Sequence, residues 1–233
     1  MKYFFYLFFL TFYTNSFSQF SGDGWDLYDG YSQYLNKIPK EISEKFIYKI
    51  KTKEKKVVLT FDDGPNKNTK QIIDFLVENN IPSTFFLISN QISEKNKNLY
   101  DNKLIDIGIH SFNHKNFDKL SKEEIESDFK KSINIFKKYK LNYTYFRPPY
   151  GIINQNMMST IENFNLKGIL WSIDSEDWNL NNMNEIILKS TKNIGPGSII
   201  LFHDHINLNT LKKIVSKILD NGYEIVPLSS FIN

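Results

Sequence analysis

The chain has 233 residues, enough for one sizeable hydrophobic core and one domain of catalytic size. Its 29 Lys and Arg residues nearly balance its 26 Asp and Glu residues, so the net charge of +3 excludes the basic excess of a dedicated nucleic-acid binder. The chain contains no cysteine, which excludes a disulfide framework, a thiolate nucleophile and a cysteine metal site.

Residues 1–18 are typical of a signal peptide. One positive charge at Lys2 precedes an apolar stretch that is too short to span a bilayer comfortably, and Ser16 and Ser18 have the spacing of small residues at a cleavage site. We therefore expect export to the periplasm, the cell surface or the extracellular space, with no stable membrane insertion after cleavage. An uncleaved anchor and a hydrophobic first helix are the alternatives. Residues 19–56, polar and rich in aromatic side chains, are predicted to form an N-terminal extension.

From residue 57 to residue 233, short β-branched or aromatic stretches alternate with helical patterns. The predicted strands are 57–61, 83–89, 104–109, 143–146, 168–173, 198–202 and 223–226. The predicted helices lie near 69–80, 91–99, 121–139, 155–164, 184–191 and 210–220. Ser121 and Glu124 have the spacing of a capping box. The alternation predicts a parallel sheet that is closed, or nearly closed, into a barrel, although periodicity alone also allows an open doubly wound sheet.

The rarest polar residues follow the predicted strands. They are Asp62, Asp63, His110, Arg147, Asp174, Asp177 and His203. In a barrel the carboxyl ends of the strands form one rim, where active sites collect. We therefore expect one pocket to receive these side chains.

Asp62 and Asp63 are adjacent at a strand end, so their side chains diverge: one carboxylate can bind a metal while the other faces a reacting group. A simple Asp-Asp-Gly-Pro turn is the alternative. His110 and His114 are four residues apart and would share a face of one helical turn. Two histidines and a carboxylate suit a divalent metal that keeps positions open for water and substrate. Two polar loop histidines are the alternative.

Arg147 is the only arginine and is followed by two prolines that stiffen the backbone. A guanidinium can fork onto a carboxylate as lysine cannot, which favours a bidentate role over that of a plain surface arginine. His203 follows a predicted strand and needs a carboxylate partner to act as an acid near neutral pH. Asp174 and Asp177 are both candidates for that partner.

Five motifs occur in the order found in the polysaccharide deacetylases, carbohydrate esterase family 4. They are Thr60-Phe-Asp-Asp-Gly-Pro65, His110-Ser-Phe-Asn-His114, Arg147-Pro-Pro-Tyr-Gly151, Asp174-Ser-Glu-Asp-Trp178 and Leu201-Phe-His-Asp204. From about residue 57 to its C-terminus, the chain resembles this family. The resemblance implies a distorted (β/α) barrel of about seven parallel strands that removes acetyl groups from N-acetylated sugars, or sometimes O-acetyl groups, with a divalent metal.

The resemblance also implies roles for single positions. The metal ligands match Asp63, His110 and His114. The catalytic residues match the base Asp62, the orienting Arg147, the oxyanion donor N–H of Tyr150, the acid His203 and its partner Asp177. The substrate-binding residues match Pro149, Trp178 and Leu201, the last two as walls of an acetyl pocket. Ile109 and Ser89 depart from the family pattern at positions near the rim, which concerns substrate fit more than the chemistry.

Together these observations predict a metal-dependent hydrolase that acts on a peptidoglycan-like or chitin-like polysaccharide. One divalent ion is expected, Zn²⁺ before Co²⁺, Ni²⁺ or Mn²⁺. A xylan-type O-acetyl esterase and a glycan-binding pseudoenzyme are the alternatives, the latter disfavoured because ligands, base and acid are all present. We expect a monomer whose partner is a polysaccharide or oligosaccharide and not a nucleic acid. His205 and the aromatic residues Trp25, Tyr28, Tyr31 and Tyr34 have no assigned part in the reaction.

Overall fold

The computed structural model describes residues 45–232, which belong to one compact unit. The predicted signal peptide and most of the predicted extension, including its aromatic residues, lie outside the described residues. Across residues 45–232, no helix has the length and apolar character needed to cross a membrane.

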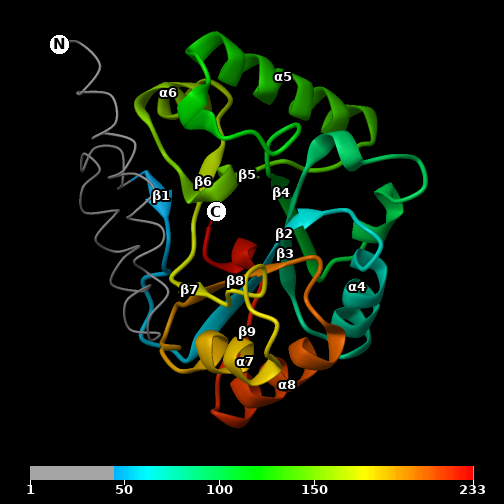
Figure 1. Cartoon of the computed structure of the whole chain (residues 1–233), viewed down its shortest axis with the longest axis vertical. Coiled ribbons are helices and arrows are strands. Elements are labelled where there is room, and N and C mark those ends of the chain that lie inside the picture. The colour runs from blue at the N-terminus through cyan, green and yellow to red at the C-terminus, as the bar shows by residue number, and fades with distance from the viewer. Residues whose placement is uncertain (1–44, 233) are drawn as a thin grey trace, which may run out of the picture. The chain divides into compact units, whose positions relative to one another are not determined.

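One parallel sheet curls through the described residues (Figure 1). Its strands are β1 Phe46–Ile47, β2 Lys56–Gly64, β3 Ser83–Leu87, β4 Ile105–Ile109, β5 Tyr145–Phe146, β6 Lys167–Ile169, β7 Ile173–Asp174, β8 Ile199–His203 and β9 Glu224–Ile225. The order is β1-β6-β5-β4-β3-β2-β8-β7, with β9 paired to β2. Within the described part of the chain no ladder joins β7 to β1. The predicted parallel α/β barrel is therefore confirmed in an open, distorted form.

The α-helices lie around the outside of this sheet (Figure 1). They are α4 Thr69–Glu78, α5 Lys122–Lys138, α6 Gln155–Asn163, α7 Met183–Thr191 and α8 Leu208–Asp220. The predicted capping box is confirmed at the start of α5, where Ser121 and Glu124 each accept a backbone N–H of the other. The apolar face of α5 is buried through Ile125, Phe129, Ile133 and Phe136.

The helix predicted near 91–99 is wrong. This segment contains two 3₁₀ turns, η1 Ser89–Gln91 and η2 Lys97–Tyr100. The Asn96 side chain accepts the Ser93 N–H at 2.7 Å and donates to the Gln91 carbonyl at 3.0 Å. Such side-chain bonds to the backbone compete with the bonds of a regular helix, so the helical pattern is interrupted here.

The strand predicted at 168–173 is divided into β6 and β7. β6 pairs with β5 and β1, whereas β7 pairs with β8 on the other edge of the sheet. Between them, the Leu170 N–H donates to the Ile47 carbonyl at 2.8 Å and the Ser172 N–H to the Ile199 carbonyl at 3.0 Å. Residues 170–172 thus cross from the β1 edge of the open sheet to the β8 side.

Three fully buried aromatic rings fix the centre of the sheet. Phe61 on β2 stacks on Phe85 of β3 at 4.8 Å and on Phe202 of β8 at 5.4 Å between ring centroids. Each such side chain contributes about 2 to 3 kcal/mol by its burial. The same packing sets the register of β2 against β8, in which Asp62 is paired with His203.

Candidate active site and metal centre

The end of β2, which carries the two aspartates, is irregular. The ladder to β3 pairs Phe61 with Phe85 and resumes only at Gly64, so the register shifts between them. Asp63 lies in this interruption with φ of +70°. A bulge of this kind re-aims side chains. The two carboxylates diverge less than their adjacent positions predict, because Asp62 Oδ2 and Asp63 Oδ1 lie 3.7 Å and 3.5 Å from the same His110 Nε2 atom.

Left-handed backbone is concentrated around the same rim. Outside glycine, positive φ occurs at Asn80, Lys140 and Asn165, which directly follow the C-caps of α4, α5 and α6 and have an ordinary capping role. The other such residues of the described chain are Asp63, Ser111, His114, Tyr150 and Glu176. Conformations of this kind cost about 1 to 3 kcal/mol each and persist where the surroundings over-determine them, which is typical of functional sites.

Arg147 lies fully buried beneath Asp62. Its Nη1 donates to Asp62 Oδ1 at 2.8 Å and to Thr60 Oγ1 at 2.8 Å, while Nη2 and Nε donate to the carbonyls of Leu170 and Ile169. The guanidinium is shared among several acceptors, which differs from the predicted bidentate fork onto one carboxylate. Burial raises the pKa of Asp62, against the opposing charge of Arg147, so the carboxylate is a stronger base than an exposed aspartate.

Asp63, His110 and His114 form a group with the donor set of a divalent-metal site. Asp63 Oδ1 lies 3.5 Å from His110 Nε2 and 3.2 Å from His114 Nε2. Ligand atoms bound to one tetrahedrally coordinated ion, with bonds of about 2.05 Å, lie about 3.3 Å from one another. Asp63 Oδ1 is a buried atom without a hydrogen-bond partner among residues 45–232, a costly arrangement that a cation would relieve. The residues present therefore fit a metal ion.

The protonation state of His110 also suits a metal ligand. Its Nδ1 lies 2.8 Å from the Arg147 carbonyl, so Nδ1 carries the proton and donates, leaving the Nε2 lone pair free. Burial lowers the pKa of His110 to about 3, which keeps the ring neutral. Asp62 Oδ2 lies 3.7 Å from the same Nε2 atom, so the predicted base and the metal group face one space.

The segment between His110 and His114 is a bent turn, so the condition under which their spacing would place them on one face, a helical turn, is not met. Positive φ at Ser111 and His114 bends it, and Ser111 Oγ accepts the His114 N–H at 2.7 Å. Asp128 on α5 holds the turn from outside by accepting the Phe112 N–H at 2.8 Å. The two imidazoles still meet, with ring centroids 4.9 Å apart.

His203 at the end of β8 is paired with Asp177. Its Nδ1 lies 2.8 Å from Asp177 Oδ1, and its backbone N–H donates to Asp177 Oδ2 at 2.9 Å. Burial acts to lower the pKa of His203, but the hydrogen bond and charge of Asp177 prevail and raise it to about 9. Asp174 instead accepts the Glu176 N–H at 2.8 Å. The structure thus decides between the two candidate partners in favour of Asp177.

The remaining predicted residues surround these groups. The Tyr150 ring packs edge-on against the His114 ring at 4.7 Å, and among the described residues its backbone N–H has no acceptor, as an oxyanion donor requires. Pro149 is buried beside it in η4 Pro149–Gly151. Leu201 is buried on β8, whereas Trp178 is 53% exposed. The acetyl-pocket role of Leu201 and Trp178 stays a prediction.

Several supporting residues were missed by the sequence analysis. Thr60 holds Arg147, and Ser175 donates to Asp177 Oδ1 at 3.0 Å. Asp204 is fully buried, accepts a hydrogen bond from Thr69 and donates its backbone N–H to the Asp62 carbonyl at 2.9 Å. A Cβ at Gly64 would lie 2.2 Å from Asp204 Oδ2, so only glycine fits there. In the sequence, these supporting residues could have been found from their positions within the five motifs, where Thr60, Gly64, Ser175 and Asp204 all lie.

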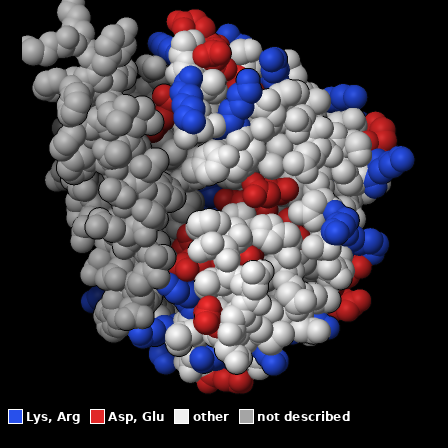
Figure 2. All heavy atoms as spheres, viewed as in Figure 1, with Lys and Arg blue, Asp and Glu red and all other residues white. Residues whose placement is uncertain are grey.

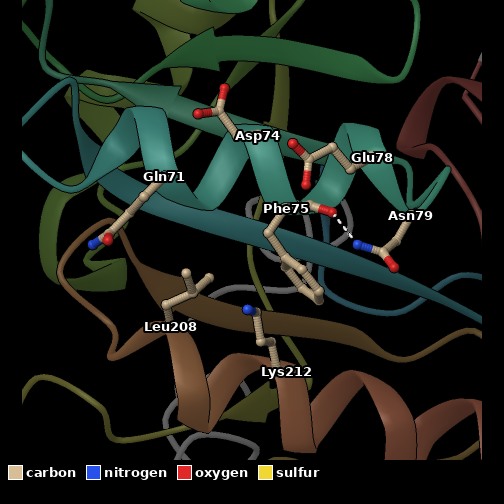
Figure 3. Close-up of a pocket in the computed structure, with 7 residues that line it drawn as sticks. All are labelled: Gln71, Asp74, Phe75, Glu78, Asn79, Leu208 and Lys212. Carbon is tan, nitrogen blue, oxygen red and sulfur yellow. Dashed lines mark hydrogen bonds between the residues drawn. The ribbon is translucent and has the colours of Figure 1, made fainter.

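Acidic side chains gather in a hollow near the middle of the face shown in Figure 2, while lysines lie mainly around its edge. A separate groove of about 520 Å³ lies between α4 and α8 and is lined by Phe75, Glu78 and Lys212, among others (Figure 3). None of the predicted site residues lines this groove. The predicted site residues therefore lie at and after the strand ends and not in this groove.

Comparison with known proteins identifies the family of the chain. Residues 49–169 match the polysaccharide deacetylase family model. The chain is 30% identical over 198 residues to the peptidoglycan-N-acetylglucosamine deacetylase PgdA of Listeria monocytogenes, over 82% of this chain and 41% of that protein. It therefore spans less than half of that relative.

Two solved structures have a similar fold. The Bc1960 peptidoglycan N-acetylglucosamine deacetylase, 29% identical, matches with a TM-score of 0.75 over 83% of this chain and 96% of that one. A family 4 pseudoenzyme from Bacillus anthracis, 23% identical, matches with a TM-score of 0.74 over 81% and 69%, which shows likeness of fold alone. With the family model covering just over half of its length, the chain belongs to the polysaccharide deacetylase family.

Proposed function

We propose that the chain is a divalent-metal-dependent hydrolase that removes acetyl groups from the N-acetylated sugars of an envelope polysaccharide. One observation carries the proposal: a partly buried Asp/His/His group, whose Asp63 Oδ1 has no hydrogen-bond partner among the described residues, lies beside Asp62. Asp62 is itself held by Arg147 and is paired in register with His203. These contacts support the proposal, because hydrolysis of an amide requires a cation site, a base and an acid at one rim.

Asp63, His110 and His114 would hold the ion, which when bound polarises the acetyl carbonyl and lowers the pKa of water. Asp62 takes a proton from the attacking water. Arg147 keeps the Asp62 carboxylate oriented through Nη1, while the Tyr150 N–H faces the developing oxyanion.

His203 supplies the proton that the leaving nitrogen needs. Asp177 stabilises its imidazolium form, so the acid is charged near neutral pH. Without this proton the leaving group would be an amide anion, which departs very poorly. The leaving group of an ester is an alkoxide, which departs more easily than an amide anion. A positioned acid therefore matters more for an amide, so the Asp177/His203 pair favours N-deacetylation over the alternative O-acetyl esterase activity.

Peptidoglycan is the favoured substrate, because the relatives with peptidoglycan in their names match the chain and the predicted leader would export it. The pseudoenzyme alternative is disfavoured because base, acid and all three ligands are present together. Periplasmic, surface or extracellular location and the monomeric state are part of the proposal and depend on the sequence alone.

The test is acetate release from peptidoglycan, chitooligosaccharides and acetylated xylan, with and without a chelator. We expect release from the first two, loss with chelator and recovery on adding Zn²⁺. Release from acetylated xylan alone would assign an O-acetyl esterase. No release from any substrate by metal-loaded protein would favour the pseudoenzyme.

A further inference from the structure

The turn that carries His114 is held in a strained conformation. Ser111 and His114 have φ of +66° and +58°, a region that side chains other than glycine rarely adopt, and Ser111 is fully buried. Such backbone persists where the surroundings over-determine it. Contacts from outside the turn must therefore hold it in place, and η1 and helix α5 supply them.

The first set of contacts comes from η1, which follows β3. The Ser89 N–H donates to the Ser111 carbonyl at 3.0 Å, and the buried Ser89 hydroxyl donates to the same carbonyl at 3.1 Å. The next N–H, that of Asn90, donates to the Phe112 carbonyl at 3.0 Å. Ser89 is a position at which the chain departs from the family pattern, and its side chain adds a hydrogen bond to this turn.

The second contact comes from α5. Asp128, which is 7% exposed, accepts the Phe112 N–H at 2.8 Å. The helix is itself anchored in the core, because the adjacent Phe129 packs against Phe146 of β5 with ring centroids 4.5 Å apart. Asp128 therefore reaches the turn from a fixed helix.

Both contacts act on one peptide group. The Ser111 carbonyl and the Phe112 N–H belong to the same planar unit, so the plane cannot rotate without breaking the bonds at both of its ends. Ser89 binds the carbonyl end and Asp128 binds the N–H end. The chain continues from this plane to His114, whose own N–H is accepted by Ser111 Oγ at 2.7 Å. The orientation of the plane therefore decides where the His114 imidazole lies relative to the other two predicted ligands.

We propose that Asp128 and Ser89 are positioning residues that hold the turn of residues 111–114 ready for a divalent ion, and that they thereby set the metal affinity of the chain. The inference rests on the proposed function only in taking Asp63, His110 and His114 as the ligands. A site whose binding-competent form is partly populated binds more weakly in proportion to that fraction. Loss of either contact lowers this fraction in the metal-free chain, although the ligands themselves are unchanged.

The test is the affinity of the metal-free full chain for Zn²⁺, measured by calorimetry. Asp128→Ala removes the acceptor of the Phe112 N–H and should weaken binding by about 10-fold, the size typical of contacts that support metal ligands. Asp128→Asn retains an acceptor oxygen without the charge and should keep most of the wild-type affinity. Ser89→Ala removes the hydroxyl but not the N–H, so we expect a smaller loss of about 2-fold to 5-fold.

Ser132→Ala is the matched control. Ser132 is buried on the same face of α5, one turn after Asp128, and its hydroxyl has no hydrogen-bond partner among the described residues. Its metal affinity should equal that of wild type. Denaturant unfolding of each metal-free variant establishes that the chain is folded under the conditions of the titration, so a loss of affinity is not a loss of fold.

Equal affinities in wild type and Asp128→Ala would overturn this proposal alone, as would an equal loss in Asp128→Asn or a loss in Ser132→Ala. If Asp128→Ala does not fold, Ser89→Ala decides, and wild-type affinity there would overturn the proposal. A wild-type chain that binds no ion would overturn the proposed function as well. Ion binding needs no turnover, so these results are independent of the acetate-release assay.

Discussion

Replacing Asp177 by Asn should move the alkaline limit of activity. Asp177 accepts hydrogen bonds from both the ring and the backbone N–H of His203, and its Oδ1 also accepts one from Ser175. Asn keeps the size and much of this bonding but removes the charge that holds His203 protonated. The perturbation is therefore electrostatic more than structural.

The magnitude follows from the pKa of His203, which the structure raises from 6.5 to about 9. A general acid must be protonated, so activity falls as pH rises through this pKa. Without the Asp177 charge, burial would leave the pKa at or below its ordinary value, a shift of about two to three pH units. At pH 8 the protonated fraction would fall about 30-fold.

The same pKa affects stability with a defined sign. Because folding raises the pKa of His203, its contribution to the free energy of unfolding is fully present below pH 6.5 and is lost as pH rises through about 9. The loss in wild type is at most about 3 kcal/mol. Asp177→Asn should flatten this part of the curve of unfolding free energy against pH.

The assay is initial-rate deacetylation of an N-acetylated oligomer from pH 5 to 10, together with denaturant unfolding over the same range. Asp174→Asn is the matched control, because it removes a neighbouring carboxylate that is bonded to the Glu176 N–H and not to His203. In Asp174→Asn the alkaline limb of the curve of activity against pH should stay near pH 9. An unmoved limb in Asp177→Asn, or equal shifts in both variants, would refute the pairing.

Three further predictions concern the proposed division of labour. The His110→Ala/His114→Ala variant should lose the tightly bound ion, measured as metal content, and an undiminished content would remove the predicted ligands. Asp62→Asn should retain the ion yet lose kcat by about 100-fold or more, whereas Asp63→Asn should lose the ion, and equal metal loss in both would contradict the separate roles of base and ligand. His203→Ala should reduce turnover of an N-acetylated oligomer far more than that of an activated acetate ester, and comparable losses would favour the O-acetyl esterase.

The sequence determined most of what depends on local pattern. Alternating strands and helices, the capping box at Ser121 and the buried face of α5 follow from side-chain periodicity, and the structure confirms them. The chemistry-bearing residues could also be named, because rare polar residues such as His110 and Arg147 follow apolar stretches. Where side chains bind the backbone within a few residues, as Asn96 does, periodicity was misleading.

Only the tertiary structure decided which of these residues meet. The choice of Asp177 over Asp174 depends on the direction of the backbone after β7, and the pairing of Asp62 with His203 depends on the register between two strands far apart in sequence. The sharing of Arg147 among a carboxylate, a hydroxyl and two carbonyls likewise depends on distant strands. Hydrogen bonds and burial act through distance and direction, which residue spacing along a chain does not specify.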